Sequence, residues 1–233
     1  MTPVVEIKGL SKIFLHHGRE IRALDNIDLN IEQGEFVALM GPSGSGKTTL
    51  LNIIAGIDRP TSGTAHILGS ELARMGESEK TKWRPRNIGY IFQFYNLLPV
   101  LTASENVELP LLVMPLSGRE RKEHVLTALT AVGLSDRMTH YPRQMSGGQE
   151  QRTAIARAIV ADPKIIVADE PTGNLDAESE KEILTLLRRL NKEFSKTLIM
   201  VTHNLAAAEY ADRVIRLEKG KLMPAAKGVA IHA

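Results

Sequence analysis

The chain has 233 residues, of which 43% are hydrophobic and 24% charged, with 29 Lys and Arg against 27 Asp and Glu. This length accommodates one large α/β domain or a domain with an inserted subdomain. The formal net charge of +2 lacks the basic excess of nucleic-acid-binding domains, so we expect no nucleic-acid partner. The absence of cysteine excludes disulfides, thiolate catalysis and cysteine metal sites, and fits a cytosolic protein.

The first ten residues lack the basic and apolar regions of a secretory signal. No stretch approaches the roughly 18 consecutive apolar residues of a membrane helix. If the protein works at a membrane, we therefore expect another chain to supply the membrane part.

Short strand-like runs alternate with longer helical patterns, which predicts an α/β fold with a mostly parallel sheet. The predicted strands are Val4–Ile7, Ile27–Ile31, Phe36–Met40, Thr64–Ile67, Ile88–Phe92, Ile165–Ala168, Leu198–Val201 and Val214–Leu217. The third, sixth and seventh are apolar throughout, as in central strands that are covered on both faces. The early runs alternate in polarity, which predicts an N-terminal antiparallel β part.

Strand patterns disappear between about Asn96 and Val160. The capping box from Ser117 to Glu120 begins a predicted helix that Gly133 is placed to end. Its apolar face carries Val125, Leu126, Leu129 and Val132. A further helix is expected at about Ala177–Phe194, with Ile183, Leu184, Leu186, Leu187 and Leu190 buried.

These patterns predict a single domain over residues 1–223. Its core comprises about 1–93 and 161–223, and a helical subdomain at about 94–160 is inserted into it. Residues 224–233 are rich in small side chains and are expected to form a loose tail.

A glycine-rich run follows the apolar strand Phe36–Met40 and precedes the helical run Thr49–Ala55. It matches G-x-x-x-x-G-K-[ST] at every fixed position, through Gly41, Pro42, Ser43, Gly44, Ser45, Gly46, Lys47 and Thr48. Glycines let backbone N–H groups turn toward phosphate oxygens, and the helix N-terminus adds its dipole. Lys47 is expected to reach the β- and γ-phosphates, and the Thr48 hydroxyl to bind Mg²⁺. The run predicts a nucleotide-binding phosphate loop that continues into Thr49; a plain Gly/Ser-rich turn is the alternative.

A second run, Met145-Ser146-Gly147-Gly148-Gln149-Glu150-Gln151-Arg152, leads into the helical pattern Ala154–Val160. It resembles the LSGGQ-x-Q-R signature of the ATP-binding-cassette (ABC) family, with Met145 replacing the usual Leu at nearly conserved volume. The resemblance implies that two copies pack head to tail. The signature of one copy (Ser146, Gly147, Gly148 and Gln149) would then face the γ-phosphate held by the other. A chance Ser-Gly-Gly helix cap is the alternative.

The same resemblance assigns roles to six further residues, and it extends over roughly Val4 to Met223. Asp169 is expected to hold Mg²⁺ with Thr48, and Glu170 to act as general base on the attacking water. Gln93 would reach the Mg²⁺ and the water site, and His203 the γ-phosphate. Asp176 belongs to a loop that crosses the dimer interface, in the run Asn174-Leu175-Asp176. Phe14 would stack on adenine, where the family more often has Tyr.

Within the family, the chain is similar to cassettes of lipoprotein-releasing and macrolide-export systems. The similarity rests on Ile91–Pro99, on Leu101–Val107 and on the run DEPTGNLD from Asp169 to Asp176. It implies an ATPase that drives a separately encoded membrane permease from the cytoplasmic side, with Phe94–Glu105 in the groove that receives the permease. The alternatives are a regulatory, cell-division or sensor cassette that moves no cargo, and a soluble cassette acting on nucleic acid or ribosomes.

Overall fold

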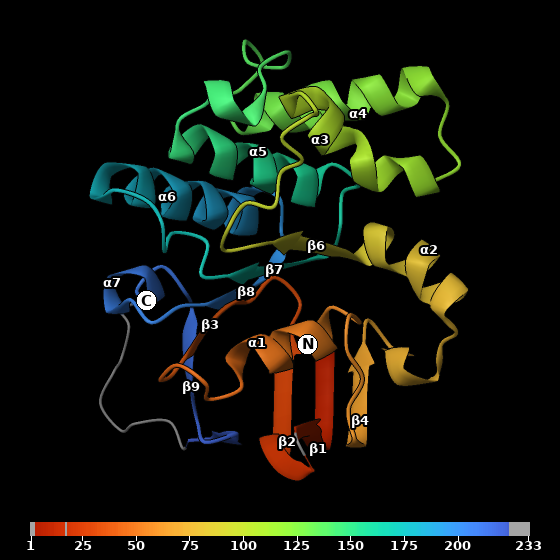
Figure 1. The fold of residues 1–233 in the computed structure, drawn as a ribbon, viewed down its shortest axis with the longest axis vertical. Coiled ribbons are helices and arrows are strands. Elements are labelled where there is room, and N and C mark those ends of the chain that lie inside the picture. The colour runs from red at the N-terminus through yellow and green to blue at the C-terminus, as the bar shows by residue number, and fades with distance from the viewer. Residues whose placement is uncertain (1–2, 17, 224–233) are drawn as a thin grey trace.

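A six-stranded sheet divides the molecule between a helical layer and a second, smaller sheet (Figure 1). The computed structural model describes residues 3–16 and 18–223. Over these residues the fold is the expected P-loop α/β core with an antiparallel part and inserted helices. The predicted tail at 224–233 lies outside the described residues.

The larger sheet has the strand order β10-β9-β3-β8-β7-β6, and every neighbouring pair is parallel except β9 and β10. Its strands are β3 (Phe36–Met40), β6 (Ile88–Ile91), β7 (Ile165–Asp169), β8 (Thr197–Val201), β9 (Arg213–Glu218) and β10 (Lys221–Leu222). The three strands predicted to be central, β3, β7 and β8, are central. Alternate side chains of each strand enter different cores: Phe36 and Ala38 face the helices, whereas Val37 and Leu39 face the smaller sheet.

The smaller sheet is antiparallel, in the order β2-β1-β4-β5. It contains β1 (Pro3–His16), β2 (Arg19–Glu32), β4 (Ser62–Ile67) and β5 (Ser70–Glu71). The first two strands are much longer than their apolar runs, because the hairpin continues past the buried pair Leu10 and Ile27. Helix α1 (Lys47–Ile54) packs its buried leucines and isoleucines between the two sheets.

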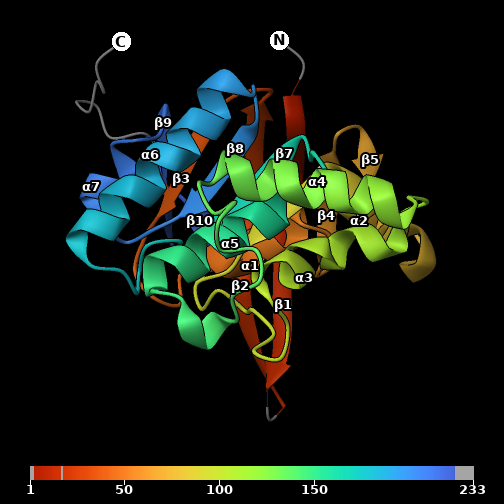
Figure 2. The same ribbon diagram turned by 90° about the horizontal axis from the view of Figure 1, so that it is seen from above.

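The inserted helices are α3 (Ala103–Glu108), α4 (Gly118–Ala131) and α5 (Gly147–Ile159), which pack on one another (Figure 2). Short 3-10 turns occur at Leu109–Val113 and Pro142–Gln144. The capping box at Ser117 is confirmed. Gly133 has φ +73°, and Leu134 N–H donates to Leu129 O at 2.8 Å. This is a Schellman end, as the glycine predicts.

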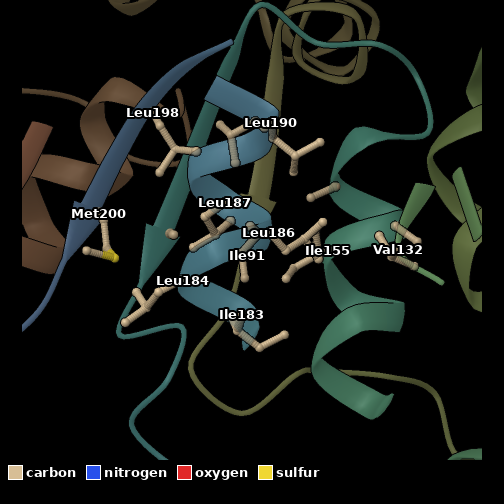
Figure 3. Close-up of a cluster of buried hydrophobic side chains, with 14 of the residues drawn as sticks. Ile91, Val132, Ile155, Ile183, Leu184, Leu186, Leu187, Leu190, Leu198 and Met200 are labelled. Atoms are coloured by element: carbon tan, nitrogen blue, oxygen red, sulfur yellow. The ribbon is translucent and has the colours of Figure 1, made fainter. Parts of the chain in front are cut away.

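Helix α6 (Ala177–Glu193) covers the helical face of the larger sheet. Its five predicted leucines and isoleucines are buried, and they pack toward Ile155 of α5 and Met200 of β8 (Figure 3). The short helix α7 (Leu205–Ala208) follows β8. Along the part of the chain that the structure describes, no helix has the length and apolarity needed to cross a membrane.

Helix α2 (Glu77–Asn87), after a 3-10 turn at Leu72–Arg74, was not predicted. It contains Pro85, and Lys80 is its only buried residue, so it has no apolar stripe to detect. Its first turn is acidic and its last turn is basic, which suits the helix dipole. This charge pattern is the feature of the sequence that could have indicated the helix.

Candidate active site

The predicted catalytic residues lie at one edge of the larger sheet, because the carboxyl ends of its parallel strands meet there. Residues 41–46 follow β3, Gln93 follows β6, Asp169 ends β7 and His203 follows β8. Since β3, β8, β7 and β6 are consecutive neighbours in the sheet, groups more than 100 residues apart converge.

The loop from Gly41 to Gly46 is closely packed on its outer side. A Cβ at Gly41 would overlap the Leu217 carbonyl oxygen, and a Cβ at Gly46 would overlap that of Ala23. Gly46 also has φ +102°, in the left-handed region that favours glycine. Both positions therefore require glycine for reasons of space.

The side chains of the loop are arranged to receive an anion. Lys47 is buried, and its Nζ donates to the carbonyl oxygens of Gly41 (2.8 Å) and Pro42 (2.9 Å). Ser45 Oγ is buried and has no hydrogen-bond partner among the described residues. A charged amine, an unpaired hydroxyl and the N-terminus of α1 fit phosphate oxygens.

Thr48 and Asp169, which are predicted to hold Mg²⁺, are in contact, with Thr48 Oγ1 donating to Asp169 Oδ1 at 3.3 Å. Burial raises the pKa of Asp169, and the negative charge of Glu170 adds to this, while Thr48 and Lys47 oppose it. No cluster of three or more acidic or histidine ligands occurs among residues 3–16 and 18–223. One hydroxyl and one carboxylate suit Mg²⁺, which takes its other ligands from nucleotide phosphates and water.

Glu170 lies between His203 and Gln93. Its Oε1 is 3.2 Å from His203 Nδ1, and Gln93 Nε2 donates to its Oε2 at 3.4 Å. Glu170 adopts φ +45°, which is strained for a side chain with a Cβ and is typical of functional sites. Its N–H donates to Val201 O on β8 (2.9 Å), and its carbonyl accepts from Gly173 N–H (3.1 Å), so backbone contacts on both sides hold this conformation.

The signature residues lie at the N-terminus of α5, apart from these groups. Ser146 caps the helix, because its Oγ accepts from Gln149 N–H (3.3 Å) while Gln149 Oε1 accepts from Ser146 N–H (3.0 Å). Ser146 and Gly147 are exposed. A Cβ on Gly147 would lie 3.2 Å from the Tyr95 hydroxyl, and one on Gly148 would lie 3.1 Å from Ser179 Oγ. The signature of one chain therefore contacts α6 and the segment after Gln93.

Asp176 caps α6, accepting from the backbone N–H groups of Glu178 (3.1 Å) and Ser179 (2.9 Å). Two residues earlier, Asn174 Nδ2 donates to Gln93 O at 3.1 Å. The loop is thus fixed at both ends, next to the catalytic residues and next to the signature helix.

Phe14 lies on the β1–β2 hairpin and is 41% exposed. It is paired with Ile21, two residues from the Ala23 carbonyl that lies against Gly46. Lys12 Nζ is 4.8 Å from the ring centroid.

Two contacts of α5 were missed from the sequence. Gln151 is fully buried, and its Nε2 donates to Pro171 O at 2.6 Å, directly after Glu170. Arg157 donates to the carbonyls of Tyr95 and Asn96. The sequence did carry a signal for both contacts, because Gln151 and Arg157 are polar residues in a helix whose other side chains are mostly small or buried.

A cavity of about 470 Å³ lies elsewhere, between α4, α5 and α6, lined by Arg152, Lys181, Glu182 and Arg189 among others. None of residues 41–48 lines it.

Known proteins resemble this chain in both sequence and fold. A family model described as "ABC transporter" matches residues 24–173. The chain is 47% identical over 222 residues to an uncharacterized ABC transporter ATP-binding protein of Thermotoga maritima, covering 95% of this chain and 94% of that protein. It is 46% identical to the macrolide export ATP-binding/permease protein MacB of Rhodopirellula baltica, over 93% of this chain but 32% of that protein.

A solved structure is similar over nearly the whole chain. It is the dimeric, post-hydrolysis state of the ATP-binding cassette MJ0796 bound to ADP and Pi; MJ0796 is from Methanocaldococcus jannaschii. The TM-score is 0.87 at 44% identity, covering 94% of this chain and 97% of that one. This chain therefore belongs to the ABC transporter family, and it is an ATP-binding ATPase of that family.

Proposed function

We propose that two copies of this chain close head to tail around ATP, and that their closing and reopening drives a separate membrane permease. The observation that carries this proposal is the separation of the site within one chain. The phosphate loop, Asp169, Glu170 and His203 converge at the sheet edge, whereas the side chain of the exposed Ser146 forms its hydrogen bond with Gln149 of its own helix cap. The dimeric state of the similar cassette MJ0796 supports a second copy as the source of the missing half.

Within each composite site, Lys47 and the amides after Gly41 bind the β- and γ-phosphates. Glu170 takes the proton from the attacking water, which Gln93 orients from the other side. His203, 3.2 Å from Glu170 Oε1, donates toward the γ-phosphate. Mg²⁺ held by Thr48 and Asp169 supplies positive charge for the phosphate oxygens when it is bound. Ser146 and the N-terminus of α5 of the partner copy stabilise the γ-phosphate from the opposite face.

The permease would contact the helical layer near Gln93. Phe94, Leu98 and Val100 are 69%, 46% and 77% exposed, and Leu112 and Val113 of the neighbouring 3-10 turn are 56% and 52% exposed. Large apolar side chains grouped on a surface are typical of a protein contact. Phe94, Leu98 and Val100 lie within the segment Phe94–Glu105, which the family resemblance assigns to the contact with the permease.

We further propose the subtype suggested by the sequence, an exporter or lipoprotein-release system at the cytoplasmic face of the membrane. The similarity to MacB, whose name joins an ATP-binding part and a permease, supports this. A cassette that signals through its membrane partner without moving cargo would use the same site. Purification of the chain with its membrane partner, followed by identification of that partner, separates the two.

Mixing two inactive variants tests the head-to-tail site. Lys47→Ala removes the phosphate-loop amine, and Ser146→Arg blocks the signature. In a mixed dimer, one site carries both lesions and the other carries neither. Random pairing should therefore restore about a quarter of wild-type ATPase activity, since about half of the dimers are mixed and each has one of two sites intact. If the signature acted on its own chain, the mixture would stay inactive.

A further inference from the structure

Arg157 of α5 contacts the segment that follows Gln93 in an unusually specific way. Its two terminal nitrogens donate to two successive backbone carbonyls, Nη1 to Asn96 O and Nη2 to Tyr95 O, each at 2.6 Å. The planar guanidinium suits such a fork, and charge-assisted hydrogen bonds of this length are strong. Burial lowers the pKa of Arg157, yet an arginine remains charged at neutral pH.

The two carbonyls belong to a strained turn. Tyr95 has φ +53° and Asn96 has φ +50°, so two successive residues with side chains lie in the left-handed region. Such conformations persist only where surrounding contacts hold them. Arg157 supplies that contact, because both carbonyls of the turn accept from its guanidinium.

Arg157 also contacts the residue before Gln93. Its guanidinium carbon lies 6.0 Å from the ring centroid of Phe92, within the range of a cation–π contact. The Phe92 ring stacks in turn on Tyr90, with centroids 4.3 Å apart. Arg157 therefore contacts the chain both before Gln93, at Phe92, and after it, at Tyr95 and Asn96. The side-chain amide of Gln93 itself donates to Glu170.

The same turn contacts the signature. The Tyr95 hydroxyl lies beside Gly147, at the N-terminus of the helix that carries Arg157. The turn after Gln93 thus lies against α5 at two places, Gly147 and Arg157, which are ten residues apart in sequence, and Ser146 caps this helix.

We propose that Arg157 is a positioning residue that fixes the turn after Gln93 and so holds the Gln93 amide against Glu170. Arg157 thereby links the turn after Gln93 to α5, the helix whose N-terminus carries the signature that would face the partner copy. The proposal rests on the catalytic role proposed above for Gln93 and goes beyond it by naming what places that residue.

A double-mutant cycle on the full chain tests this. Arg157→Met removes the fork but keeps a long side chain, and it should lower kcat about 10- to 100-fold, since small misplacements of a catalytic group have effects of this size. The KM for ATP should stay within about twofold, because the phosphate loop is untouched. Arg157→Lys should recover part of the loss. If Arg157 acts through Gln93, the double variant Gln93→Ala/Arg157→Met should be no slower than Gln93→Ala alone.

Arg189→Met is the matched control. Arg189 of α6 donates to the Ala131 carbonyl at the end of α4, so it also joins two helices through an arginine-to-carbonyl hydrogen bond. Its loss should lower the Tm and leave kcat unchanged.

Two results would overturn the proposal, and a third would overturn the role of Gln93 on which it rests. Losses in kcat that multiply in the double variant would mean that Arg157 acts independently of Gln93. A wild-type kcat in soluble Arg157→Met, or in Arg157→Lys if the first variant does not fold, would remove Arg157 from positioning. A normal kcat for Gln93→Ala would instead overturn the role of Gln93 itself, which separates the failure of the proposed mechanism from that of the Arg157 proposal.

Discussion

The carboxyl edge of the larger sheet and the N-terminus of α5 carry the two groups of expected site residues, and the two groups differ in the contacts that they make within one chain. At the sheet edge, Thr48 contacts Asp169, and Glu170 lies between His203 and Gln93. At α5, Ser146 forms hydrogen bonds with Gln149 of the same helix: its N–H donates to Gln149 Oε1, and its Oγ accepts from Gln149 N–H. Groups that are proposed to act together are in contact at the first place, whereas the second has an exposed helix N-terminus, which the proposed head-to-tail dimer would place against a second copy.

The reason for the difference is architectural. Parallel strands bring their carboxyl ends to one edge whatever their separation in sequence, so the sheet assembles its residues without help. A helix N-terminus directs its free N–H groups away from its own body. Such a group acts on a ligand only if the ligand, or a chain that holds it, comes to that end.

The largest effect is expected from a substitution among the residues that meet at the carboxyl edge of the larger sheet. Glu170→Gln keeps the shape and the contact with Gln93 but removes the base, so kcat should fall about 1,000-fold. ATP binding should persist, and a closed, ATP-bound dimer should accumulate, which size-exclusion chromatography with ATP measures. Glu178→Gln, an exposed change on α6, is the control and should behave as wild type. Near-normal turnover by Glu170→Gln would remove Glu170 as the base.

A smaller effect is expected from a substitution among the signature residues at the exposed N-terminus of α5. Ser146→Arg should lower kcat by about 100-fold, as removal of a transition-state donor does, while ATP binding to the single chain stays intact. Equilibrium binding of a fluorescent ATP analogue, alongside the ATPase rate, separates the two quantities. A loss of binding would place Ser146 in the site of its own chain and contradict the head-to-tail arrangement.

Ser117→Arg is the matched control for this variant. Ser117 caps α4 with the same capping box as Ser146, and Glu120 N–H donates to its Oγ at the same 3.3 Å. Both variants lose a helix cap, at a cost of about 1 kcal/mol in the free energy of unfolding. Only the Ser146 variant should lose turnover.

The smallest effect concerns stability. Asp169 has a raised pKa because it is buried beside Glu170, so its ionised form is disfavoured in the folded state. Asp169→Asn should therefore raise the free energy of unfolding of the nucleotide-free protein at pH 7 to 8. It should also weaken Mg²⁺-dependent hydrolysis.

The sign of the pH dependence follows from the direction of the shift. Between the unfolded value of about 3.9 and the raised folded value, the folded wild type binds more protons than the unfolded chain. Its stability relative to Asp169→Asn should thus fall as the pH rises through this window, and the difference should vanish near pH 4. Asp176 has a lowered pKa, through hydrogen bonds led by those from Ser179, so Asp176→Asn should destabilise. Urea unfolding across pH checks both signs.

Much of the fold was predictable because the apolar runs are long and regular. Phe36–Met40 is β3 as predicted, and the capping box at Ser117 with Gly133 bounded α4 correctly. Helix α2 was not found, since a helix with one buried residue leaves no periodicity in the sequence. The outer β1–β2 hairpin was missed for the same reason, because beyond Leu10 nearly all of its side chains except Leu24 are partly or fully exposed.

The sequence by itself determined the chemistry of this protein: Gly41 to Thr48, Ser146 to Gln149, and the Asp169–Glu170 pair are contiguous runs whose order of residue types is the signal. Only the tertiary structure decided which of them meet. Contacts such as Gln93 with Glu170, or Arg157 with the turn at Tyr95 and Asn96, join residues about 60 to 80 positions apart. They depend on strand order and helix packing, which local patterns do not encode. For the same reason only the fold shows that Ser146 lies away from the phosphate loop of its own chain.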